Sequence, residues 1–263
     1  MKPENFHRHA PAEAIYGVYY TRLGREGRNS WASCWNISGP NGPPLSLRLK
    51  PCIIYAMSAA RKPLCLGIGG GSGSGKSGLA HYVARRLGRR AVIVCQDWYY
   101  RDNGNLSIKQ SRRLNFDHPS AIETPLLCRQ LDGILGGKPI DAPRYDYATH
   151  ARLKQTRVVE PAALVILEGL LVLHDKKLRD RMDCSVFIDV PDDLRLLRRI
   201  RRDVEHRRVN LEETLRLYEH CVRPMQMKFI GPAAARATFR WHQLDDDGFK
   251  DRVYNLIKKR LSR

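Results

Sequence analysis

From about residue 63 onward, short runs of apolar residues alternate with segments of helical periodicity. Four runs, at residues 64–68, 91–97, 163–169 and 185–190, are almost continuously apolar, which is typical of strands buried on both faces of a sheet. Segments between them repeat apolar residues four positions apart, as amphipathic helices do. These positions are Leu79, Val83 and Leu87 in one segment, and Leu127, Leu131 and Leu135, before Gly136, in another. The alternation predicts an α/β fold built on a parallel sheet.

The first 62 residues differ from the rest of the chain. They show no sustained periodicity of either kind, and they carry the turn-forming stretch "GPNGPP" at residues 39–44. We expect residues 1–62 to be a poorly ordered extension and residues 63–263 to form one principal domain. Met57 is an alternative start of the working chain, because the sequence after it leads directly into the first predicted strand.

Net charge and cysteine usage narrow the classes of partner. The 263 residues carry a formal net charge of +19, which predicts anionic partners such as a nucleotide, a nucleic acid or a membrane surface. No apolar stretch approaches the roughly 20 residues of a membrane span, so we expect no membrane partner. The seven cysteines are scattered without metal-binding spacing, which predicts reduced thiols and a cytoplasmic location.

Residues 69–77 read "GGGSGSGKS" and fit the phosphate-binding pattern G-x-x-x-x-G-K-[ST] between a predicted strand and a predicted helix. Glycines let backbone N–H groups converge on phosphate oxygens, and the N-terminus of the helix adds its positive end. The predicted nucleotide-binding residues here are Gly70, Gly71, Ser72, Gly73, Ser74, Gly75, Lys76 and Ser77. Lys76 would reach the β- and γ-phosphates, and the Ser77 hydroxyl would bind Mg²⁺. A glycine-rich linker is the structural alternative.

The guanine-reading pattern [NT]-K-x-D of GTPases is absent from the chain, which favours ATP as the nucleotide. The phosphate loop leaves the acceptor open, since water, a protein, a nucleic acid or a small alcohol would each be compatible with it.

Two carboxylates follow apolar runs at the ligand-binding end of the predicted sheet, Asp97 after "AVIVCQ" and Glu168 after "ALVIL". A buried carboxylate is costly unless it is paired or bound to metal. We interpret Asp97 as a general base toward a hydroxyl group and also as a residue of the metal site. We interpret Glu168 as a member of the Mg²⁺ shell, directly or through water. The alternative for each is a helix N-cap.

The densest basic run, "DDLRLLRRIRRDVEHRR", covers residues 192–208. On a helix, Arg195, Arg198, Arg199 and Arg202 would share one face, while Leu196, Ile200 and Val204 would line another. Guanidinium groups on one face suit phosphate binding and stabilisation of charge during phosphoryl transfer. We therefore expect Arg195, Arg198 and Arg202 to bind ATP, and Lys76, Arg199 and Arg202 to join Asp97 in catalysis. The alternative is a solvated basic face or a nucleic-acid-binding stripe.

Six segments resemble the uridine/cytidine kinases, within the wider group that includes phosphoribulokinase. The segments are "QDWYYRD" (96–102), "NFDHPSAIE" (115–123), "PRYDYATHAR" (143–152), "LEGLL" (167–171), "RLLRRIRRDV" (195–204) and "VRPMQMKFI" (222–230). They follow the family's order and cover about residues 63–232. The resemblance implies a P-loop kinase fold: a central parallel sheet of about five strands flanked by helices, a small β-hairpin and an arginine-rich helical lid.

The resemblance also implies an activity, the ATP- and Mg²⁺-dependent phosphorylation of a nucleoside 5′-hydroxyl. Asp97 and Glu168 match the catalytic aspartate and the metal-shell glutamate, and Asp117, assisted by Arg199, matches the ribose-binding aspartate. Tyr145 and His150 fall at the base-recognition positions, where a phenol and an imidazole can hydrogen-bond a pyrimidine edge. The implied lining of the nucleoside pocket is Tyr100, Phe116, Tyr147 and Leu170. Homotetramers are common in this family, so we expect a homo-oligomer.

One departure from the family pattern concerns ribose binding. Where the family usually reads E-R-G-R, this chain reads "HRRV" at residues 206–209, so Val209 takes the place of a ribose-contacting arginine. Arg207 and Arg208 are the candidate substrate-binding residues that remain in this segment.

Two further functions stay open. One is a kinase of the same fold acting on another sugar alcohol or nucleoside, such as ribulose phosphate or a nicotinamide-type nucleoside; "PRYDYATH" favours a pyrimidine instead. The other is a nucleic-acid-binding P-loop ATPase, which the net charge suggests. The final "KKRLSR" ends an amphipathic helical segment, where cations favour the helix dipole, so we expect no nucleic-acid partner.

Overall fold

The computed structural model describes residues 62–111, 113–147, 149–242 and 248–262. The predicted extension at residues 1–62 lies, except for its last residue, outside the described residues, as does the alternative start at Met57.

Five strands form one parallel sheet in the order β2-β7-β1-β8-β9. Their bounds are β1 Leu64–Gly70, β2 Ala91–Cys95, β7 Leu164–Glu168, β8 Cys184–Asp189 and β9 Phe239–His242. The first four coincide with the four apolar runs, and β7 is buried along its whole length. The edge strand β9 has no such run: its Trp241 is buried, while its other residues are half-buried or exposed. The prediction of a central parallel sheet of about five strands is confirmed.

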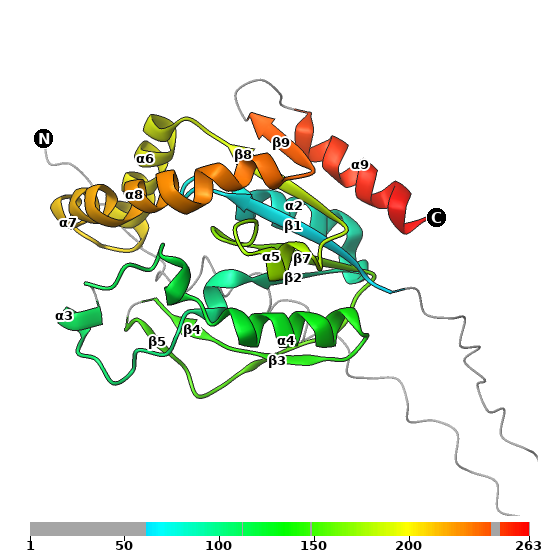
Figure 1. Cartoon of the computed structure of the whole chain (residues 1–263), viewed down its shortest axis with the longest axis horizontal. Helices are drawn as coiled ribbons and strands as arrows, with labels where there is room; N and C mark the ends of the chain where they lie inside the picture. The colour runs from blue at the N-terminus through cyan, green and yellow to red at the C-terminus, as the bar shows by residue number, and fades with distance from the viewer. Residues whose placement is uncertain (1–61, 112, 148, 243–247, 263) are drawn as a thin grey trace, which may run out of the picture. The chain divides into compact units, whose positions relative to one another are not determined.

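Helices connect the strands and cover both faces of the sheet (Figure 1). The α-helices are α2 Lys76–Leu87, α3 Ile108–Ser111, α4 Thr124–Leu135, α5 Lys176–Arg179, α6 Asp192–Arg201, α7 Leu211–Leu217, α8 Arg223–Met225 and α9 Phe249–Leu261. The 3-10 segments are η1 Gly88–Arg90, η2 Gln96–Tyr99, η3 Pro119–Ala121 and η7 Gly231–Arg236, and the π-helical segments are η4 Arg202–His206, η5 Tyr218–Val222 and η6 Gln226–Ile230. None of the described helices is both long and apolar enough to cross a membrane.

Two clusters of buried side chains fill the two faces of the sheet. On one face, residues of α2 and α9 such as Leu79 and Val253 pack on alternate strand residues such as Ile68. On the other face, Leu131 of α4 and Leu178 of α5 pack against Val165 and its neighbours. Because both faces are covered, the central strands read as continuous apolar runs in the sequence.

Two short antiparallel pairs lie one inside the other between α4 and β7. The outer pair joins β3 (Ile140–Ala142) to β6 (Arg157–Val159), and the inner pair joins β4 (Tyr145–Asp146) to β5 (Ala151–Arg152). We call the inner pair, residues 145–152, the base-recognition hairpin, after the prediction that its Tyr145 and His150 contact the base.

Two local expectations need correction. Strand β2 ends at Cys95 rather than Asp97, so Asp97 lies in the first turn of η2, just beyond the sheet. The arginine-rich run is not one continuous α-helix: α6 passes into the π-turn η4, where Arg207 N–H bonds to the Arg202 carbonyl. The wider turn alters the helical register, and Val204, expected on an apolar face, is 39% exposed.

Candidate active site

The carboxyl ends of the strands bring the predicted catalytic groups to one edge of the sheet. Ile68 and Cys95 both pair in register with Glu168, and Gly70 pairs with Ile188. The phosphate loop therefore leaves β1 beside the ends of β2 and β7, where Asp97 and Glu168 lie. This edge is where ligands bind in open α/β sheets.

The phosphate loop depends on glycine where its backbone turns. Gly73 has φ +81°, and a Cβ there would lie 2.5 Å from the carbonyl oxygen of Arg195. Gly75, with φ +89°, is the N-cap of α2, so that helix begins at Lys76. L-residues with side chains seldom adopt these angles, and the turn aims the first N–H groups of α2 at the loop. The geometry suits a chain of phosphates.

Arg195 lies beneath this loop. Its side chain is 2% exposed, and its guanidinium donates to the carbonyls of Val190 at 3.1 Å and Ser72 at 3.5 Å and pairs with Asp192. The guanidinium is thus bonded to backbone of the loop and of the preceding segment, and the contact of Arg195 with ATP stays a prediction. Arg195 supports the phosphate loop from behind.

The Ser77 hydroxyl lies 3.2 Å from both carboxylate oxygens of Glu168. Burial raises the pKa of Glu168, an effect that the nearby Lys76 ammonium opposes and the Asp97 carboxylate reinforces. The Cys95 side chain also favours the charged form of this carboxylate, which lowers its pKa. None of the described residues forms a cluster of three or more side chains able to hold a metal by themselves. The hydroxyl of Ser77 and the carboxylate of Glu168 are oxygen donors of the kind that suits Mg²⁺, which usually keeps waters and phosphate oxygens among its ligands and takes only one or two groups from protein.

A second buried carboxylate, Asp117, lies within electrostatic reach of Asp97 and Lys76. Burial raises its pKa, and Asp97 raises it further, whereas the cations Arg199, Lys76 and Arg202 lower it. Asp97 itself is half-buried. The structure thus brings together the predicted base, the predicted ribose-binding carboxylate and three of the predicted cations.

The arginine lid, residues 192–208, contacts the phosphate loop directly. Arg199 Nη1 donates to the Ser72 hydroxyl at 3.0 Å, and Arg198 Nη1 lies 3.4 Å from the Gly73 carbonyl oxygen. Burial lowers the pKa of Arg199, while Asp117 and Asp203 favour its charged form. Guanidinium groups therefore lie over the loop that would hold the phosphates.

The predicted nucleoside-binding aromatic residues form one cluster, Tyr100, Phe116, Tyr145, Tyr147 and His150. The Tyr100 ring lies 5.3 Å from that of Phe116 and 5.2 Å from that of Tyr145, between ring centres. The His150 ring stacks on Phe116 at 4.9 Å, and Tyr147 meets Tyr145 edge-on at 5.5 Å. We call these five residues the aromatic cluster. Leu170 is buried in the same core as Tyr100 and Tyr145.

The Tyr145 hydroxyl is buried and makes no well-aligned hydrogen bond to a described residue. Burial raises the pKa of Tyr145 to about 12, so the group stays protonated at neutral pH. A protonated phenol can donate as well as accept a hydrogen bond, which suits the recognition of a polar ligand edge.

The residues of the "HRRV" segment differ in their surroundings: Arg207 contacts site residues, whereas Arg208 is exposed to solvent. The Arg207 guanidinium lies 5.5 Å from the Tyr147 ring centre and 3.6 Å from Asp203 Oδ1, so Arg207 joins the lid to the aromatic cluster. Arg208 is exposed and has φ +56°, and among the described residues no hydrogen bond or ion pair links it to Asp117. The half-buried Val209 bonds through its N–H to the Asp203 carbonyl at 3.0 Å.

Asp203 is a site residue that sequence reasoning missed. Its side chain is 6% exposed and contacts Arg199 at 3.2 Å, Arg202 at 2.9 Å and Arg207 at 3.6 Å. Its four-residue separations from Arg199 and Arg207 are the only sequence signal, and such spacing is common on solvated helices.

Gln96 is another such residue. It is buried, and its side-chain oxygen accepts from the Leu171 N–H at 2.8 Å, which holds the segment after Glu168 against the segment that carries Asp97. The sequence analysis included Gln96 in the segment "QDWYYRD" but gave it no role of its own.

Known proteins of one family are similar to this chain. The sequence model described as "Phosphoribulokinase / Uridine kinase family" matches residues 65–246. The chain is 42% identical over 178 residues to a uridine kinase of Lactobacillus helveticus, covering 67% of this chain and 84% of that protein. It is 41% identical over 205 residues to a uridine kinase of Ligilactobacillus salivarius, covering 76% and 96%.

Among solved structures, a candidate fructose transport system kinase from Silicibacter sp. TM1040 superimposes with a TM-score of 0.57 at 21% identity, covering 69% of this chain and 91% of the other. That likeness shows a shared fold. The family match and the two sequence identities show more: the chain is a kinase that belongs to the Phosphoribulokinase / Uridine kinase family.

Proposed function

We propose that this protein transfers the γ-phosphoryl group of ATP to the 5′-hydroxyl of uridine or cytidine, giving UMP or CMP. The observation that carries the proposal is the position of Asp97 and Asp117. Asp117 lies within electrostatic reach of both Asp97 and Lys76 of the phosphate loop, and Tyr100 of the aromatic cluster lies within electrostatic reach of both carboxylates. A nucleoside whose base meets the aromatic cluster would present its ribose to this pair.

In the proposed reaction, the Asp97 carboxylate accepts the proton of the 5′-hydroxyl while that oxygen bonds to the γ-phosphorus. The bond from the γ-phosphorus to the bridging oxygen breaks, and ADP leaves. Lys76, Arg199 and Arg202 offset the negative charge on the transferring group, and Asp117 holds the ribose hydroxyls. Ser77 and Glu168 would hold Mg²⁺, which supplies charge neutralisation at the phosphate oxygens.

Exclusion of water matters, because a water in place of the acceptor would give wasteful hydrolysis. The contacts of Arg199 and Arg198 with the loop support this role for the arginine lid. The same proposal includes a cytoplasmic location and a part in pyrimidine salvage. The expected homotetramer remains a prediction, to be checked by light scattering on the purified protein.

The test measures ADP release with ATP and Mg²⁺ in the presence of uridine, cytidine, adenosine, nicotinamide riboside or ribulose 5-phosphate, and with no acceptor. Turnover on uridine or cytidine with little acceptor-free hydrolysis is the expected result. Turnover confined to another acceptor would overturn the pyrimidine assignment and keep the kinase assignment.

The variant Asp97→Asn should keep its affinity for ATP and lose about 10²- to 10⁴-fold in kcat, the usual contribution of a general base. Asp180→Asn is the matched control, because this exposed carboxylate pairs with Lys176 on α5. Near-normal kcat in Asp97→Asn would refute the base assignment.

A further inference from the structure

The residues proposed to contact the base and the residue proposed to act on the 5′-hydroxyl belong to different parts of the chain. Tyr145 and His150 belong to the base-recognition hairpin, whereas Asp97 belongs to η2 after strand β2. Strands β4 and β5 have two residues each, and a pair that short does not hold its position by its own hydrogen bonds. Another contact must set the distance between the hairpin and Asp97.

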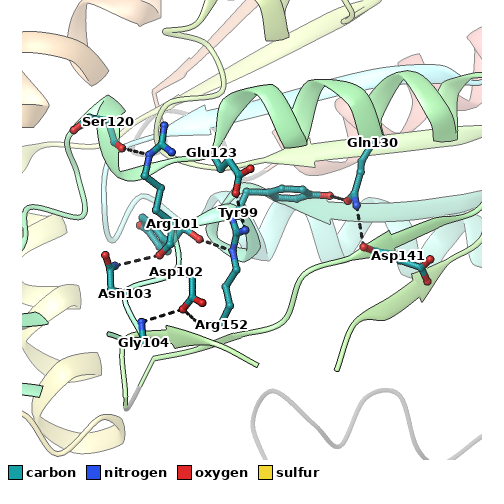
Figure 2. Close-up of polar contacts among 11 residues, drawn as sticks. Tyr99, Arg101, Asp102, Asn103, Gly104, Ser120, Glu123, Gln130, Asp141 and Arg152 are labelled. Carbon is teal, nitrogen blue, oxygen red and sulfur yellow. Dashed lines mark hydrogen bonds and ion pairs between the residues drawn. The ribbon is translucent and has the colours of Figure 1, made fainter. Parts of the chain in front are cut away.

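Arg152 makes that contact. It is the cross-strand partner of Tyr145, so it leaves the hairpin opposite the predicted base-reading residue. Its Nε donates to the Tyr100 carbonyl at 2.7 Å, and its Nη1 contacts Glu123 Oε2 at 2.6 Å (Figure 2). Its backbone N–H also donates to Asp102 Oδ1 at 3.1 Å. Figure 2 shows the Arg152 side chain extending from the hairpin toward Glu123 and Tyr99.

The two partners of Arg152, Tyr100 and Glu123, lie in neighbouring segments whose backbones are joined by hydrogen bonds, and one of these segments follows Asp97. Glu123 N–H donates to the Tyr99 carbonyl at 2.8 Å, and Arg101 N–H donates to the Ala121 carbonyl at 2.8 Å. Tyr100 bridges to Ile122 in the same ladder and directly follows η2, which carries Asp97. A shift of Arg152 would therefore move the hairpin relative to Asp97.

Both bonds of the guanidinium point toward these joined segments. The third donor, Nη2, is buried without a hydrogen bond to any described residue, so two bonds alone fix the group. The Arg152 and Glu123 side chains are 16% and 31% exposed, which limits screening by solvent. A lysine at position 152 would keep the charge but lose the planar fork that reaches a carbonyl and a carboxylate at once.

We propose that Arg152, through Glu123 and the Tyr100 carbonyl, sets the position of the base-recognition hairpin relative to Asp97 and thereby determines nucleoside affinity. Arg152 is a positioning residue, because it acts through Tyr145 and His150 rather than on the reacting atoms. The proposal rests on the proposed nucleoside kinase function. It assigns nothing to the ATP site, which lies on separate elements.

The test compares Arg152→Gln and Arg152→Lys with Lys154→Gln, which removes an exposed charge from the segment just after the hairpin. For each protein we would measure kcat, KM for uridine, KM for ATP, melting temperature, and the Kd of uridine by calorimetry. We expect both Arg152 variants to raise KM and Kd for uridine at least tenfold and to change KM for ATP less than twofold. Lys154→Gln should change each of these values less than twofold.

A role in stability alone predicts a different pattern. The melting temperature would fall while the Kd of uridine stayed unchanged, or the KM values for uridine and ATP would rise together, and either outcome would overturn the proposal. Arg152→Lys tests the geometry separately from the charge, so normal uridine affinity in this variant would also overturn it.

Glu123→Gln provides a second route if the Arg152 variants fold poorly, because it keeps the bond to the Tyr100 carbonyl. It should weaken uridine binding about threefold or more, and Arg152→Gln should then cost less in this background than in the wild type. Independent, additive effects would contradict the pairing.

Failure of the proposed function has a separate signature. If the wild-type protein neither binds nor phosphorylates uridine or cytidine, the pyrimidine assignment is wrong, and the same variants are measured with the acceptor of the panel that is phosphorylated. Absence of turnover on every acceptor would overturn both proposals.

Discussion

The guanidinium of Arg199 donates a hydrogen bond to the Ser72 hydroxyl at 3.0 Å, which joins the arginine lid to the phosphate loop. The same side chain contacts Asp203 Oδ2 at 3.2 Å, and Asp117 favours its charged form. Arg199 thus contacts the phosphate loop through Ser72 and the lid carboxylate Asp203, and it lies within electrostatic reach of Asp117, the predicted ribose-binding carboxylate.

Arg199→Gln should lower kcat at least 100-fold, because it removes a cation that would face the transferring phosphoryl group. Arg201→Gln should leave kcat within twofold, since Arg201 is exposed on the same helix. Steady-state assays with saturating ATP and uridine separate the two. Similar losses in both variants would mean that the net charge of the lid matters rather than the placement of Arg199.

Asp203→Asn should reduce kcat about tenfold and raise KM for ATP. The variant keeps the shape of the side chain but removes the charge that holds Arg199, Arg202 and Arg207. Loss of one member of a largely buried ion pair destabilises by about 3–5 kcal/mol, and because Arg202 and Arg207 are partly exposed we expect about 1–3 kcal/mol here. Glu205→Gln, an exposed carboxylate in the same π-turn, is the control. If both KM for ATP and kcat were unchanged, Asp203 would have no role in the function of the site.

Arg208 should be a point of backbone strain, because its φ of +56° lies in the left-handed region. That conformation costs an L-residue about 1–2 kcal/mol, and glycine avoids the cost at an entropic penalty of about 0.5–1 kcal/mol. Arg208→Gly should therefore raise the free energy of unfolding by about 0.5–1 kcal/mol, and Arg208→Val, which is β-branched, should lower it. Urea unfolding gives both values. A valine variant as stable as the glycine variant would show that this position is not strained.

Glu168→Gln should stabilise the nucleotide-free protein at neutral pH while abolishing turnover. Burial raises the pKa of Glu168 above its ordinary value of 4.5, so the folded state favours the protonated form. The stabilising contribution of that form is complete below pH 4.5 and is lost as pH rises through the raised pKa. The melting temperature of the variant should exceed that of the wild type at pH 7, and the difference should shrink as pH falls toward 4.5.

Mg²⁺ with ATP should raise the melting temperature of the wild type more than that of Glu168→Gln, and chelation of the metal should remove that extra protection. Glu160→Gln, an exposed carboxylate before β7, is the control and should follow the wild type throughout. Equal protection of wild type and Glu168→Gln by Mg²⁺ with ATP would exclude Glu168 from the metal shell.

The local pattern of the sequence was enough to predict the parallel sheet and the phosphate loop. Strands buried on both faces must be apolar at nearly every position, and a loop that presents backbone N–H groups to phosphates requires glycine at fixed spacing. Both requirements act within about ten residues, so they appear directly in the chain. The sequence pattern did not predict the edge strand β9, because an edge strand needs no continuous apolar run. Of the residues of β9, only Trp241 is buried.

Tertiary structure decided the contacts between distant segments. Periodicity put Arg195 and Arg199 on the same helix face, but packing buries Arg195 against the Ser72 carbonyl and lets Arg199 donate to the Ser72 hydroxyl. Arg152 carries no local signal, because its partners lie on other elements of the fold. Asp203 carries only a four-residue spacing from Arg199 and Arg207, which is common on solvated helices. The sequence by itself thus determined which chemistry is present and on which elements. Only the packing of those elements decided which charged groups face the proposed substrates and which hold other residues in place, because such partnerships depend on distances in space that no spacing along the chain records.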